Sequence, residues 1–231
     1  MRLLLCSLTA TALATLAPSA ASAAVRDYPA RDFDHVDLRA AAEVTITAGP
    51  RFSVHADGDP RLLERLTADV RGGTLVLGWQ PHSGSVETHD KPLRIAITMP
   101  RVAGAGVSGA GSIAIDRAEA PAFTADIGGA GTIRVGTLRS NRADLSMGGT
   151  GSISVAGTTG RIDARVSGVG SIDAGALAAR EGRATMSGTG QIRAQVNGPV
   201  DVTMSGMGHV EIGGHPRCTV HKSGLGTIRC G

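Results

Sequence analysis

The chain has 231 residues and, with 23 Lys and Arg against 20 Asp and Glu, a formal net charge of only +3 at pH 7. The basic residues are scattered and nearly all are arginine, which excludes the clustered basic stripe of a nucleic-acid-binding protein. Aromatic residues make up 2% of the chain, so the core must be a regular stack of small aliphatic side chains.

Residues 1–23 have the parts of a secretory signal peptide. Arg2 supplies the positive charge, residues 3–16 form an apolar stretch too short to span a bilayer, and residues 21–23 read Ala-Ser-Ala, the small-x-small pattern of a cleavage site. The alternative is an ordinary buried N-terminal helix. We expect cleavage after Ala23 and export to the periplasm, the cell surface or the medium. No later segment is apolar and long enough to span a membrane.

Residues 24–105 predict a β-rich cap that covers the first coils of the following repeat. Alternating or apolar runs indicate strands at 36–38, 43–46, 52–54 and 93–99. Residues 59–66 predict one short helix, because Asp59 can cap it and Pro60 suits its first position. Gly72 and Gly73 lie between two apolar runs and predict a hairpin. The polar stretch 80–90 predicts a loop.

Residues 106–231 contain a glycine-rich motif, Ser/Gly-Gly-x-Gly-x-Ile/Val, seven times. The spacings between successive copies are 20, 20, 19, 20, 18 and 18 residues. A period near 20 indicates a solenoid, in which each unit buries its apolar face only by stacking on its neighbours. The second residues of the motifs are Gly109, Gly129, Gly149, Gly168, Gly188, Gly206 and Gly224.

Apolar residues alternate with polar ones on both sides of every motif, which is the pattern of a β-strand. The glycines allow a sharp corner and a close approach of adjacent backbones. The sequence therefore predicts an all-β fold, a right-handed parallel β-solenoid of about seven coils, with two inward columns. One column is Ile127, Met147, Val166, Met186 and Met204; the other is Ile113, Ile133, Ile153, Ile172, Ile192, Val210 and Ile228.

The last coil departs from this pattern. Lys222 takes the slot that Met204 fills one coil earlier, so that end of the stack should be open to water. Cys218 and Cys230 take the slots of Val200 and Ile212, and we expect them to form a disulfide in an oxidising compartment. The alternative is a pair of buried thiols.

The order of these features resembles a known family over nearly the whole mature chain. The matching stretches are Phe33 with Val36, then 44–46, 62–63, 73–75, and the strand 95–100 that leads into the first motif at 107–113. They resemble the putative auto-transporter adhesin head domain family, also called the GIN domain. The resemblance implies a β-solenoid in exported bacterial proteins, and it carries over no catalytic residue.

Two nucleotide- and metal-binding motifs are excluded by their context. Residues 104–109 match G-x-G-x-x-G, but the glycines belong to the repeat and no helix follows. A calcium-binding β-roll needs an aspartate where every copy here has Ile or Val, such as Ile133. His209, His215 and His221 could hold zinc or copper, but their spacing matches no standard ligand set, so we interpret them as surface residues. The same applies to His82 and His89.

The outward positions carry mostly Ser, Thr, Asp and Arg, with no metal, cofactor or catalytic residue assigned. We expect a non-enzymatic, adhesin-like or envelope-scaffold protein that binds a glycan or an envelope protein through an extended polar face. The alternative is a polysaccharide lyase or hydrolase that uses outward carboxylates such as Asp126 and Asp144, one coil apart. Self-association through the ends is a third possibility, which Lys222 disfavours.

Overall fold

The computed structural model describes residues 24–80 and 93–231. The expected signal peptide at 1–23, and His82, His89 and nearly all of the expected loop at 80–90, lie outside these residues. Within the described ranges, no helix has the length and apolar character needed to cross a membrane.

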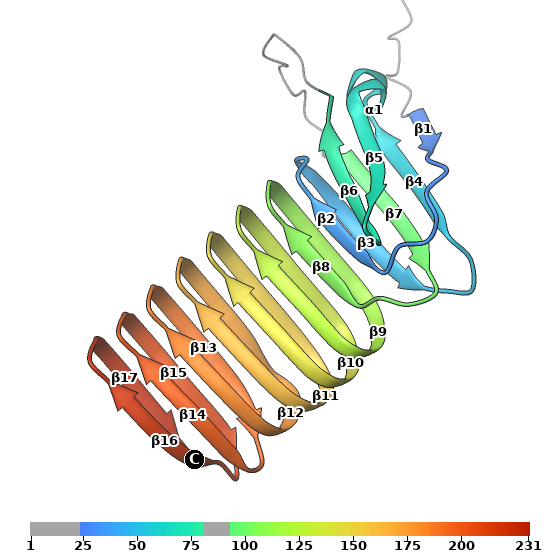
Figure 1. The fold of residues 1–231 in the computed structure, drawn as a ribbon. Helices are drawn as coiled ribbons and strands as arrows, with labels where there is room; N and C mark the ends of the chain where they lie inside the picture. The colour runs from blue at the N-terminus through green and yellow to red at the C-terminus, as the bar shows by residue number, and fades with distance from the viewer. Residues whose placement is uncertain (1–23, 81–92) are drawn as a thin grey trace, which may run out of the picture.

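The elements are one short helix and a series of strands that pair into one continuous sheet wound into coils (Figure 1). The N-terminal elements are β1 (Ala24–Asp27), β2 (His35–Leu38), β3 (Ala42–Ala48), β4 (Ser53–Gly58), α1 (Pro60–Arg65), β5 (Leu66–Arg71), β6 (Thr74–Trp79) and β7 (Leu93–Met99). The others are β8 (Gly104–Val107), β9 (Ala110–Ile127), β10 (Ala130–Met147), β11 (Thr150–Val166), β12 (Val169–Met186), β13 (Thr189–Val196), β14 (Pro199–Met204), β15 (Met207–Gly214), β16 (Arg217–Lys222) and β17 (Leu225–Cys230).

The repeat region is a parallel β-solenoid of flattened coils, as expected. Each of β9 to β12 leaves one glycine motif, turns back halfway along its length and returns to the next motif (Figure 1). In later coils the two arms are separate strands, such as β13 and β14. We call the side with the motifs the glycine edge and the opposite side the bend edge. The solenoid has about six turns, close to the seven coils expected.

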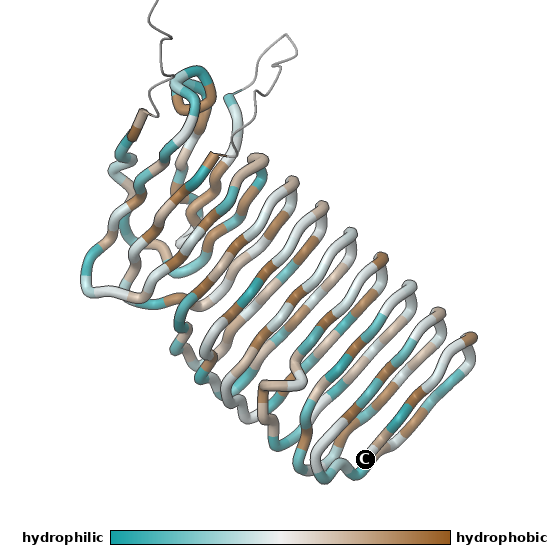
Figure 2. The backbone as a smooth tube through the Cα atoms, turned by 180° about the vertical axis from the view of Figure 1, so that it is seen from behind, coloured by the Kyte–Doolittle hydropathy of each residue, from teal (hydrophilic) through white to brown (hydrophobic). Residues whose placement is uncertain are grey.

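Both predicted inward columns are confirmed by the strand register. Ile133 lies between Ile113 and Ile153, and the column continues through Ile192 to Ile228. Met147 lies between Ile127 and Val166 in the second column. The members as far as Val210 and Met204 are buried, and hydrophobic and hydrophilic positions alternate along the arms (Figure 2). Burial of one such aliphatic side chain contributes about 1.5–3 kcal/mol, so stacking supplies the stability.

The motif glycines allow the backbones of successive corners to approach closely, and they also allow the sharp turn of each corner. A Cβ atom on Gly149 would overlap the carbonyl oxygen of Gly129 in the preceding motif. Gly151 also has a φ of 147°, a conformation that residues with a side chain rarely adopt. The corners therefore stack with backbone against backbone, which leaves no room for a methyl group.

The first coil was not visible in the repeat. Strands β2 and β3 lie inside the stack, because β2 pairs in parallel with both β6 and β8, and β3 pairs in parallel with both β7 and β9. The chain thus forms the β2–β3 coil first and places β6 and β7 on one side of it. It then places β8 and β9 on the other side. The corner between β2 and β3 at 39–41 has no glycine, which is why the motif search missed it.

Antiparallel strands cover the outer side of these first coils. β5 pairs with β6, and β4 pairs with both β7 and β1. The hairpin around Gly72 and Gly73 is confirmed, as is the helix: Asp59 accepts a hydrogen bond from the backbone of Arg61, 2.8 Å away. The Tyr28 hydroxyl donates to the carbonyl of Leu63 at 2.9 Å, and burial raises the pKa of this phenol. Such strands protect a sheet edge from pairing with other chains.

The C-terminal coil has the expected register. Lys222 is the in-register neighbour of Met204 and is exposed, while Cys218 and Cys230 follow Val200 and Ile212. The structure pairs Cys218 with Cys230 as a disulfide that joins β16 to β17, with their Cα atoms 6.6 Å apart.

Removal of this disulfide should loosen the last coil selectively. A bridge between residues 12 apart stabilises by about 3 kcal/mol in the chain-entropy description. We expect the double variant Cys218→Ser with Cys230→Ser to lose most hydrogen-exchange protection in β16 and β17, whereas β9 to β11 keep theirs. Thr219→Ser is the matched control. Unchanged protection in the double variant, or two free thiols in protein produced under oxidising conditions, would contradict the disulfide.

Candidate functional site

An open groove of about 760 Å³ crosses the bend edge. It is lined by residues 119–121 of β9, 137–141 of β10 and 157–158 of β11, and we call it the bend groove. Its volume falls within the ~300–1,000 Å³ typical of ligand sites. Glu119, Arg139, Asn141 and Thr158 are exposed in it.

The groove lies where the coil repeat changes length. β11 has 17 residues and β10 has 18, and the pairing between them slips between Val135 and Leu138. Leu138 consequently faces Gly157, whose φ of 126° and close approach to the Leu138 backbone exclude a side chain. The spacing of 19 between Gly149 and Gly168 was the only sign of this feature in the sequence.

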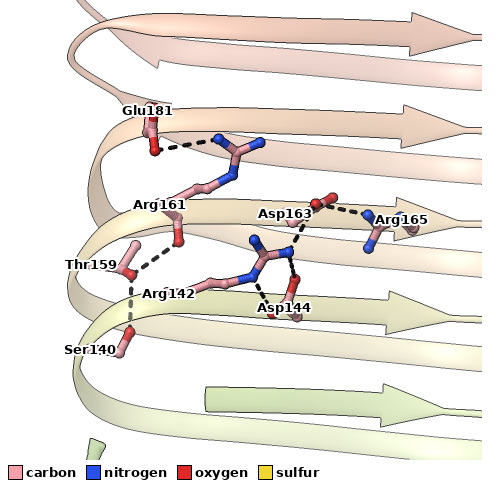
Figure 3. A network of polar contacts seen from close by, with 8 residues as sticks. All are labelled: Ser140, Arg142, Asp144, Thr159, Arg161, Asp163, Arg165 and Glu181. Atoms are coloured by element: carbon pink, nitrogen blue, oxygen red, sulfur yellow. Dashed lines mark hydrogen bonds and ion pairs between the residues drawn. The ribbon is translucent and has the colours of Figure 1, made fainter. Parts of the chain in front are cut away.

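Beside the groove, a network of arginines and carboxylates covers the returning arms of β10 to β12 (Figure 3). Arg142 donates two hydrogen bonds of 2.7 Å to Asp144, and its Nη2 lies 3.5 Å from Asp163. Arg165 donates to Asp163 at 2.7 Å, and Arg161 donates to Glu181 at 3.3 Å. Three guanidinium groups and three carboxylates therefore balance one another in this network.

Asp163 is the deepest member of the network. It points outward from the sheet, yet only 2% of its side chain is exposed. Oδ2 accepts from Arg165, whereas the buried Oδ1 has no hydrogen-bond partner among the described residues. The buried Nε of Arg161, two positions earlier on the same outer face of β11, is also unpartnered within the described part of the chain. One unused donor and one unused acceptor thus occur at neighbouring outward positions.

Hydrogen bonds connect the bend groove to this network. The hydroxyl of Ser140, which lines the groove, is 2.9 Å from the buried hydroxyl of Thr159. Thr159 in turn donates to the carbonyl of Arg161 at 3.1 Å. Figure 3 shows Ser140 and Thr159 at the bend and Asp163 with Arg165 further along the arm. The groove and the network are therefore joined by a short chain of hydrogen bonds.

The charged groups of this network are already paired with one another. The hydrogen bonds and charge of Asp144 raise the pKa of the Arg142 guanidinium, so this group stays charged. Asp144 is correspondingly occupied by two guanidinium hydrogen bonds, and Asp163 by Arg165. A general acid or base needs a carboxyl group that is free to exchange a proton with substrate.

The carboxylates expected for an enzyme are not opposed across a groove. Asp126 lies beside Gly106 and Ser146, whereas Asp144 lies beside Thr124 and Asp163. The two are on adjacent coils of the same face, as expected, but are offset by two residues along the strand. The bend groove itself contains one carboxylate, Glu119.

A second hollow, of about 410 Å³, lies in the N-terminal region between Phe33, Phe52 and Arg101. Its carboxylate Asp34 is bonded to His35 at 2.7 Å and to Arg101 at 2.9 Å. Burial alone would raise the pKa of Asp34, but these two partners outweigh it and lower the pKa below its ordinary value. Asp34 is therefore already paired with His35 and Arg101, and we assign no ligand to this hollow.

The C-terminal histidines are not gathered into a site. His209 is on β15, His221 is on β16, and His215 lies in the connection between these strands. Over residues 24–80 and 93–231, no three His, Cys, Asp or Glu side chains are grouped as they would be around a metal ion.

The glycine edge presents a different surface from the bend edge. The third positions of the motifs lie in one row by register, and three of them, Val169, Met207 and Leu225, are exposed hydrophobic residues. None of the motif turns from residue 108 onward carries an ionisable Asp, Glu, Lys or Arg side chain. This edge therefore presents exposed apolar side chains, but no Asp, Glu, Lys or Arg side chain that could make a directed contact.

Comparison with known proteins agrees with this architecture. Residues 32–216 match the family described as putative auto-transporter adhesin, head GIN domain. The chain belongs to this family. The match includes the bend groove, the polar network and the inserted β2–β3 coil.

Solved structures of similar proteins share the fold. A putative adhesin from Bacteroides fragilis superposes with a TM-score of 0.81 at 23% identity, covering 90% of this chain and 96% of that one. A putative lipid binding protein from Parabacteroides distasonis has a TM-score of 0.64 at 19% identity, covering 89% and 95%. A putative adhesin from Parabacteroides merdae has a TM-score of 0.63 at 15% identity, again covering 89% and 95%. No curated protein sequence matches the chain.

Proposed function

We propose that this protein is exported and serves as an adhesin-like binding module, which holds another macromolecule through the bend groove and the adjoining polar network. The family and two of the three neighbouring structures are described as putative adhesins, in line with such a role. Extended surfaces that run over several coils are the usual binding sites of repeat proteins.

The observation that carries the proposal is the connection of an open groove to a polar surface whose charged groups are already paired. Arg142 and Arg165 are held by Asp144 and Asp163, yet about half of each guanidinium side chain remains exposed. A guanidinium group has five N–H donors, so a paired arginine keeps donors for a partner. The motif turns of the glycine edge carry exposed hydroxyls but no Asp, Glu, Lys or Arg side chain.

A polysaccharide-cleaving enzyme is the weaker candidate. Its carboxylates would have to face each other about 5–10 Å apart across the substrate. Asp126 and Asp144 are offset on one face, and Asp144 is bound to Arg142. If Asp144→Asn abolished a measured glycan-cleaving activity, the binding-module proposal would fail.

Loss of the groove arginine should weaken partner capture. We expect Arg139→Ala to reduce the affinity for a captured partner about tenfold, because a charge-assisted hydrogen bond is lost. Arg134→Ala is the matched control: it is on the same strand and equally exposed, but lies on the opposite arm, away from the groove. Binding would be measured with the exported protein against cell-envelope fractions. Equal capture by both variants would remove the groove from the function.

A further inference from the structure

The first clue to the ligand is the balance of charge in and beside the bend groove. Glu119 and Arg139 are register neighbours on β9 and β10, and both are exposed in the groove. The adjoining network has three guanidinium groups against three carboxylates, and each guanidinium group contacts a carboxylate. A site for a polyanion needs an excess of cationic groups, and this surface has none.

The second clue is the pair of unpartnered polar atoms on β11. The Nε–H of Arg161 can only donate and Oδ1 of Asp163 can only accept, and neither has a partner among the described residues. A sugar hydroxyl can accept from the first kind of group or donate to the second. Side-chain movement of the half-exposed Arg165 and Arg142, which lie against Asp163, would open this position to a ligand.

The third clue is the lining of the groove. Ser140, Asn141 and Thr158 offer two hydroxyls and an amide, each of which can both donate and accept hydrogen bonds. Pro121, which is exposed, supplies a small apolar surface for C–H groups. The backbones of β9, β10 and β11 already pair with one another along the returning arms, so a peptide could not add there as a further strand.

We propose that the bend groove binds a neutral, hydroxyl-rich saccharide, with Arg161 and Asp163 of the adjoining network as receptors of sugar hydroxyls. This inference rests on the proposed binding function and names the class of its partner. Paired guanidinium and carboxylate groups with side-chain amides match the alternating donors and acceptors of a sugar. Pro121 supplies an apolar contact, since no aromatic residue lines the groove.

The test uses the exported protein on a glycan array that carries neutral, sialylated, sulfated and uronate-containing saccharides. We expect binding to neutral glycans, with affinity changing less than about twofold between 0.05 and 0.5 M NaCl because no net charge is screened. Asn141→Ala combined with Thr158→Val should weaken it about tenfold, since two polar contacts are lost. Gln195→Ala combined with Thr203→Val is the control, since both residues are exposed on later coils.

Arg161→Lys separates the proposed hydroxyl contact from a charge effect. Lysine keeps the positive charge near Glu181 but has no donor at the Nε position, so we expect about fivefold weaker binding of the neutral glycan with unchanged thermal stability. Unchanged affinity in this variant would overturn the role of Arg161 and Asp163.

The other outcomes separate the inference from the proposed function. Binding restricted to acidic glycans and lost at high salt would overturn the neutral-saccharide class but keep the binding module. Groove-dependent capture of an envelope protein, with no glycan bound on the array, would do the same. If the protein showed neither glycan binding nor groove-dependent capture, both the saccharide inference and the proposed function would be overturned.

Discussion

Gly151→Ala is expected to destabilise the protein by more than about 4 kcal/mol, enough to prevent stable folding of a marginally stable domain. The new Cβ would overlap the carbonyl oxygen of Gly131, which belongs to the corner of the preceding coil. The φ of 147° adds backbone strain of about 1–3 kcal/mol for a residue with a side chain. Neither corner can move without disturbing the ladder hydrogen bonds on both arms.

Gly148→Ala is the matched control, because it makes the same chemical change three residues earlier. Its nearest heavy atom would be the Ser167 Oγ at 3.9 Å, and its φ is not in the left-handed region. We expect this variant to stay within about 1 kcal/mol of the wild type in urea unfolding followed by circular dichroism. Equal stability of the two alanine variants would show that the corners do not require backbone contact.

Phe123→Ala should cost about 4 kcal/mol, the usual range for removal of a fully buried phenylalanine. Phe123 is fully buried in β9, and its register neighbour on β10 is the small Ala143. The ring therefore fills space that the next coil leaves open, and the alanine variant would have a cavity there. Because the ring lies where the N-terminal coils join the repeat, its loss should also reduce the cooperativity of unfolding.

Phe123→Leu serves as the comparison, since it keeps most of the apolar volume, and we expect a loss of about 1 kcal/mol. Both variants would be measured by urea unfolding, with hydrogen exchange to locate the change. A loss below about 1 kcal/mol for the alanine variant would contradict the cavity argument.

The sequence by itself determined the solenoid, its register and its last coil. Glycine corners and period-two alternation repeat seven times, so each apolar residue can have only one kind of neighbour in the next coil. This is why the pairing of Ile133 with Ile113, and of Cys218 with Val200, could be predicted. The helix cap at Asp59 and the hairpin at Gly72 depend on neighbouring residues alone, so they could be predicted without the tertiary structure.

Tertiary structure alone decided where β2 and β3 lie. Parallel pairing between strands remote in sequence depends on packing, and the corner at 39–41 carries no glycine that would mark it as a coil. Nothing local distinguishes a strand that caps the stack from one that is inserted into it.

The candidate site also depended on the three-dimensional arrangement. Asp163 occupies an outward position in the alternating pattern, where a carboxylate is normally solvated, and it becomes buried only because arginines from two coils lie against it. The bend groove arises because one coil is a residue shorter than its neighbours. The repeat therefore determined the scaffold, whereas the binding surface arose where one coil departs from the repeat and long side chains from different coils meet.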